Sequence, residues 1–133
     1  MNKRDMSLDK YGISKKRYRE LRYFCEQYPE WKSEVANQAF ISSPKLDGMP
    51  HGANVGNPTL QAALTMQEKK ERIDLIESTA VQAADDLWYW LIRNICYEIP
   101  VGVLVYSDGM PMSQSQFYHY RRYFFYLLDR KRK

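Results

Sequence analysis

The sequence predicts an all-α protein, and three observations support this fold class. Apolar residues recur every three or four positions along most of the 133-residue chain, which is the period of an amphipathic helix. Ser14, Ser113 and the pair Asn57-Pro58 stand where such segments begin, as expected of helix N-termini. Glycine and proline gather between residues 41 and 57, where they interrupt any regular element. We expect an N-terminal helical pair, a long central helix and a C-terminal helix-turn-helix.

The N-terminal helical pair begins with a helix over Lys15–Gln27, capped by the hydroxyl of Ser14. Its apolar stripe consists of Tyr18, Leu21, Cys25 and Tyr28. Pro29 ends this helix or opens the next one, because proline is tolerated in a first helical turn. The second segment would cover Glu30–Ala39, with Trp31 directed inward.

Residues 41–57 are expected to form a flexible loop or linker, since a connection of this length is unusual within a compact domain. Asn57-Pro58 then resembles an N-cap followed by proline at the first helical position. Helical spacing continues over 58–97, as one helix or two, with Ser78-Thr79 as a plausible break. The expected organisation is therefore 1–40 as an N-terminal basic helical segment, 41–57 as the linker, and 58–133 as the central helix followed by the C-terminal helix-turn-helix.

The segment 100–107 is ambiguous between helix and strand. Alternating valines favour a strand, but no second strand is visible to pair with it, so we expect a short buried helix. Asp108-Gly109 marks a turn, and Ser113 caps a final helix over 114–131. A short helix, a glycine-containing turn and a capped basic helix form the layout of a helix-turn-helix, whose second helix enters the DNA major groove.

Positive charge is concentrated at both ends of the chain. Residues 1–22 carry a net charge of +5, residues 119–133 carry +5, and the segment between them carries −6, which together give the total of +4. Two basic ends suit double-stranded DNA as a partner. Glutamine can pair with adenine and arginine with guanine or phosphate. The candidate DNA-binding residues are Gln114, Ser115, Gln116, Tyr118, His119, Arg121, Arg122, Lys131, Arg132 and Lys133, with a second basic face at Lys15, Lys16, Arg19 and Arg22.

Two aromatic-basic blocks, LDKYGISKKRYRELRYFCEQYPEWK at 8–32 and FYHYRRYFFYLLDRKRK at 117–133, resemble phage-encoded transcriptional regulators of the ArpU/RinA type. The resemblance spans nearly the whole chain. It implies a regulator of late genes in a phage or prophage, with a helix-turn-helix similar to region 4 of sigma factors at roughly 79–131. The valine-rich PVGVLVY departs from this pattern, because a more polar first helix is expected there.

Other functions have little support in the sequence. His51 and His119 lack zinc-ligand spacing with Cys25 and Cys96, so no metal or cofactor is expected, and the two cysteines are interpreted as buried thiols. No nucleophile–base set or phosphate-binding glycine loop is present, so we expect no enzyme. The chain shows no membrane-spanning run and no signal peptide, and a cytoplasmic protein of a bacterial host cell is expected.

Two further classes remain open. One is an oligomeric packaging protein similar to a small terminase subunit, and the other is an interaction module that binds host RNA polymerase or another host factor. A homo-oligomer is compatible with either.

Overall fold

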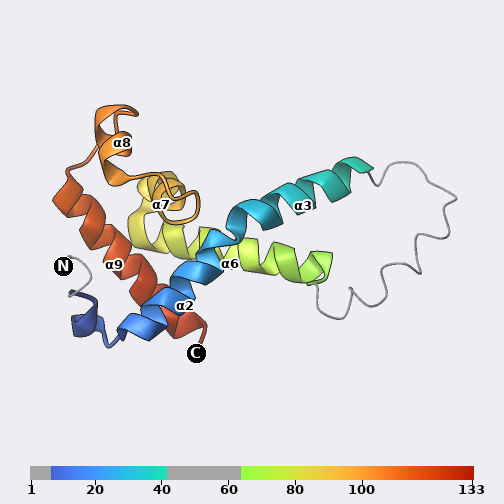
Figure 1. Ribbon diagram of the computed structural model, residues 1–133, viewed down its shortest axis with the longest axis horizontal. Helices are drawn as coiled ribbons and strands as arrows, with labels where there is room; N and C mark the ends of the chain where they lie inside the picture. The colour runs from blue at the N-terminus through green and yellow to red at the C-terminus, as the bar shows by residue number, and fades with distance from the viewer. Residues whose placement is uncertain (1–6, 42–63) are drawn as a thin grey trace, which may run out of the picture.

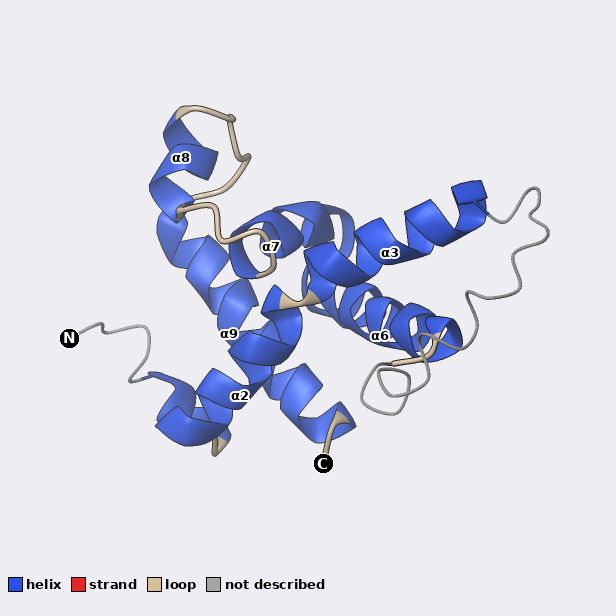
Figure 2. Ribbon diagram, turned by 45° about the vertical axis from the view of Figure 1, so that its right-hand side comes forward, coloured by secondary structure: helices blue, strands red, loops and turns tan. Residues whose placement is uncertain are grey.

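The computed structural model describes residues 7–41 and 64–133, which are helical and contain no strand (Figures 1 and 2). The predicted all-α class is confirmed. The elements are η1 (Ser7–Tyr11), α2 (Lys15–Glu26), α3 (Tyr28–Ile41), α6 (Met66–Ala84), η2 (Asp85–Leu87), α7 (Trp88–Ile95), α8 (Val101–Tyr106) and α9 (Gln114–Lys131). The linker predicted at 41–57 and the helix start predicted at Asn57-Pro58 fall largely outside these residues.

Side-chain caps fix the starts of three helices. The Ser14 hydroxyl accepts from the Arg17 amide at the start of α2, and the Ser113 hydroxyl accepts from the Gln116 amide at the start of α9, each at 3.1 Å. Both predicted caps are confirmed. The helix α6 begins with a reciprocal capping box between Thr65 and Glu68 that the sequence reading missed.

The central segment is interrupted at Asp85, and the break suggested at Ser78-Thr79 is wrong. The Thr79 hydroxyl donates to the Leu75 carbonyl one turn earlier, at 2.6 Å, so it bonds within the helix instead of ending it. Asp85 has φ 49° and ψ −120°, which is outside the helical regions, so the helix cannot continue through this residue. Two adjacent acidic residues at a helix C-terminus are also unfavourable next to its negative dipole end. The chain therefore turns there and continues as α7.

The valine-rich segment forms the short helix α8, which confirms the prediction of a helix instead of a strand. Val101 and Leu104, one helical turn apart, are buried, whereas Val103 is 41% exposed. The Met110 amide donates to the Leu104 carbonyl at 2.8 Å and closes the following turn, in which Gly109 has φ +71°. Residues 107–113 form a connection to α9 that is longer than the usual turn of about 3–4 residues in a helix-turn-helix.

A single hydrophobic cluster includes residues from both the N-terminal and the C-terminal segments. Helix α9 packs against α6 and α2, while α3 lies beside α6 and extends away from α8 (Figures 1 and 2). Cys25 and Cys96 are buried free thiols, as expected, and burial together with the neighbouring Cys25 thiol raises the pKa of Cys96. None of the described helices is long and apolar enough to cross a bilayer.

Candidate nucleic-acid interface

The beginning of α9 presents a polar surface. Gln114, Ser115, Gln116 and His119 are exposed, and Phe117 between them is fully buried. Phe117 anchors one side of the helix, and Ser115 and His119, two positions before and after it, project from the opposite side. Gln116 also donates to the Tyr120 hydroxyl, at 3.5 Å. Four of the ten C-terminal candidates therefore lie together on one exposed turn and a half of helix.

Arg121 is directed into the protein. Its Nε donates to Asn94 Oδ1 at 2.9 Å, and its Nη1 donates to the Tyr18 hydroxyl at 2.8 Å. The guanidinium also lies 5.1 Å from the centre of the Phe125 ring. These contacts join α9 to α7 and α2, so Arg121 serves to position helices in this structure. Arg122, next in sequence, is half-buried and has no ion-pair partner among the described residues.

The predicted phosphate-binding tail is largely engaged by the protein. Lys131 donates to Gln82 and, at 3.1 Å, to the buried Thr79 hydroxyl of α6. The Arg132 guanidinium lies 3.7 Å from the centre of the Phe24 ring. Burial lowers the pKa of Lys131 and, with help from nearby Arg72 and Arg17, that of Arg132. Lys133 approaches Asp129 at 3.8 Å. Much of this charge therefore serves to attach the end of α9.

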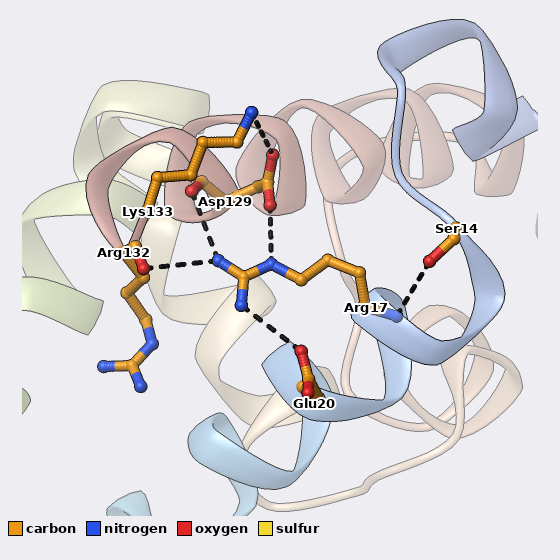
Figure 3. A network of polar contacts seen from close by, with 6 residues as sticks. All are labelled: Ser14, Arg17, Glu20, Asp129, Arg132 and Lys133. Atoms are coloured by element: carbon orange, nitrogen blue, oxygen red, sulfur yellow. Dashed lines mark hydrogen bonds and ion pairs between the residues drawn. The ribbon is translucent and has the colours of Figure 1, made fainter.

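A buried carboxylate anchors the same end (Figure 3). Asp129 is 5% exposed, and its Oδ1 accepts from Arg17 Nε at 2.7 Å. Arg17 Nη2 donates to the backbone carbonyls of Asp129 and Arg132, each at 3.4 Å, and Nη1 pairs with Glu20. The Asp129 hydrogen bond is the main cause that raises the pKa of Arg17. Sequence reasoning missed this pair, although Asp129 is the sole acid in its basic block.

The second basic face is the more available one. Lys15, Lys16 and Arg19 on α2 are exposed and have no ion-pair partner among the described residues. Arg22 pairs with Glu26 at 3.1 Å. A hollow of about 260 Å³ beside η1 and α2 is lined by Leu8, Ile13, Ser14, Lys15, Tyr18, Arg19 and Arg22.

Tyr18 connects the two candidate regions. The guanidinium groups of Arg22, from α2, and Arg121, from α9, both lie 5.8 Å from its ring centre. Its ring also packs edge-on against Phe125 of α9, at 5.0 Å between centroids. The basic face of α2 and the middle of α9 therefore meet at one buried aromatic side chain, an arrangement that no local sequence pattern signals.

Comparisons with protein-family models, with curated proteins and with solved structures find no match for the chain. Within residues 7–41 and 64–133, no group of three or more histidine, cysteine, aspartate or glutamate side chains is placed to hold a metal ion. His51 lies outside this range. The candidate interface is thus defined by geometry and charge alone.

Proposed function

We propose that the protein is a sequence-specific DNA-binding transcriptional regulator that reads the major groove with the first turns of α9. The phage or prophage setting and the action on late genes come from the ArpU/RinA-type resemblance of the two aromatic-basic blocks. The proposal retains a sigma-region-4-like helix-turn-helix formed by α8, its turn and α9.

The observation that carries the proposal is the exposed polar start of α9 on a firmly packed helix. Gln114 and Gln116 offer exposed amide groups that can pair bidentately with adenine, and the exposed His119 follows about one turn after Gln116. Phe117, Phe124 and Leu128 are fully buried, so the helix is held by its other face. A rigid helix that presents amides to solvent is what major-groove reading requires.

Free charge on α2 supports the same proposal. Lys15, Lys16 and Arg19 are exposed, and phosphate contacts supply most of the affinity of DNA-binding proteins. Because Tyr18 packs against Phe125, these charges belong to a helix fixed directly to α9. We assign phosphate contacts to them and to Arg122, and we assign Arg121 a positioning role.

Selection of bound fragments from a random duplex library tests the proposal. The wild-type chain should enrich a defined motif, and the double variant Gln114→Ala, Gln116→Ala should lose preference at adenine positions. Each good bidentate contact discriminates by about 1–3 kcal/mol. Gln38→Ala, at an exposed position of α3, is the matched control and should leave the motif unchanged. Recovery of fragments without any enriched motif would contradict sequence-specific reading.

A further inference from the structure

The hollow beside η1 and α2 combines three cationic side chains with an apolar floor. Lys15, Arg19 and Arg22 recur at intervals of four and three residues, which places them along one side of α2. Leu8, Ile13 and Tyr18 contribute buried side chains to its lining. No acidic residue lines the hollow.

Two of the three cations in the hollow are not balanced by the described residues, and the third, Arg22, pairs with Glu26. Lys15 and Arg19 have no carboxylate partner there, whereas Arg17, on another side of the same helix, is paired with both Asp129 and Glu20. The first turn of α2 contains no acidic residue, so its positive dipole end adds to the charge of Lys15. Like charges one helical turn apart repel each other. An anion in the hollow would relieve this repulsion.

The shape and donors of the hollow narrow the class of ligand. Its volume of about 260 Å³ is below the roughly 300–1,000 Å³ of sites for drug-sized ligands, so a small group fits best. The Lys15 ammonium and the Arg19 guanidinium are the unpaired donors, and the Arg22 guanidinium lies beside them while it pairs with Glu26. These three cations suit an anion with several oxygen acceptors at different angles.

We propose that this hollow is a phosphate-binding site, which takes either a free phosphorylated small molecule or a phosphate of a nucleic-acid backbone. The site is formed by Lys15, Arg19, Arg22 and Tyr18. It does not depend on base reading by α9, because none of these residues belongs to the exposed start of that helix.

The test uses inorganic pyrophosphate and a random-sequence DNA duplex as two separate probes of the full chain. Affinity for each is measured by calorimetry or fluorescence anisotropy for the wild type, for Arg19→Gln and for the control Lys70→Gln. Lys70 is an exposed cation of α6 that does not line the hollow. Circular dichroism melts establish that the variants are folded.

The expected result is that Arg19→Gln weakens binding of at least one probe by about tenfold, the effect of losing one charge-assisted hydrogen bond. Lys70→Gln should change binding of either probe much less. Loss of pyrophosphate binding identifies a free phosphate as ligand, and a loss confined to the duplex identifies the DNA backbone. The proposal is overturned if neither probe binds, or if Arg19→Gln and Lys70→Gln have equal effects on both. The fragment-selection experiment with Gln114 and Gln116 tests base reading by α9 separately. Failure of the phosphate site and failure of sequence-specific reading are therefore distinguishable.

Discussion

The two basic ends of the chain have the same net charge but different surroundings. In the N-terminal block, Lys15, Lys16 and Arg19 extend into solvent without partners among the described residues. In the C-terminal block, Lys131, Arg132 and Lys133 contact Gln82, the Phe24 ring and Asp129. Equal charge in the sequence therefore differs in its partners: three exposed cations of α2 have no ion-pair partner among the described residues, whereas each of the last three side chains of the chain contacts another part of the protein.

The largest expected effect on stability comes from removing the ion pair between Arg17 and Asp129, which joins the two basic blocks. Arg17→Ala leaves the buried Asp129 carboxylate with Lys133, at 3.8 Å, as its one remaining ion-pair partner among the described residues. We expect the free energy of unfolding to fall by about 2–4 kcal/mol, measured by chemical denaturation. Lys16→Ala, on the same helix but without partners, should stay within about 0.5 kcal/mol of the wild type. If the two variants are equally stable, the Arg17–Asp129 pair does not stabilise the contact between the two blocks.

A second pair of variants compares neighbours on α9. Arg121→Ala removes the hydrogen bonds to Asn94 and Tyr18, which should lower the free energy of unfolding by about 1.5–3 kcal/mol. Arg122→Ala should change it by less than about 0.5 kcal/mol. Thermal and urea denaturation of both variants provide the measurement. If Arg122→Ala proves the more destabilising change, the inward direction of Arg121 is wrong.

The salt dependence of DNA binding measures how many cationic side chains of each block contact phosphate. A triple variant with glutamine at Lys15, Lys16 and Arg19 should reduce the slope of log affinity against log salt by about 0.9 for each lost phosphate contact. The matching triple change at Lys131, Arg132 and Lys133 should reduce the slope by less, because these side chains are engaged internally. Anisotropy titrations at several salt concentrations give both slopes. A larger reduction from the C-terminal set would reverse the comparison.

The smallest effect concerns the two helix caps. Ser14→Ala and Ser113→Ala each remove one hydroxyl that accepts from a backbone amide at 3.1 Å. Each change should cost about 1 kcal/mol of stability, and the two costs should be similar because capping is local. Melting temperatures of the two variants provide the check. A markedly larger cost for Ser14→Ala would show that the start of α2 also depends on contacts beyond its own turn.

Local features of the fold were predictable from the sequence. Ser14 and Ser113 begin α2 and α9 as expected, and the buried side of α9 follows its apolar period. Such features depend on residues three or four positions apart, so sequence spacing contains the information. The break was expected at Ser78-Thr79 and lies instead at Asp85. The Thr79 hydroxyl donates to a carbonyl of its own helix, and composition does not reveal whether such a residue bonds within a helix or ends it.

By itself, the sequence determined the all-helical class, the caps and the position of charge along the chain. Only the tertiary structure decided which charges are free. Arg17 meets Asp129 across 112 residues, and Arg121 meets Tyr18 across 103. The state of a charged side chain depends on its spatial neighbours, and for these two arginines the neighbours are brought near by the packing of α2 on α9. The exposed cations of α2 and the polar start of α9 therefore emerge as a candidate interface only once the helices are assembled.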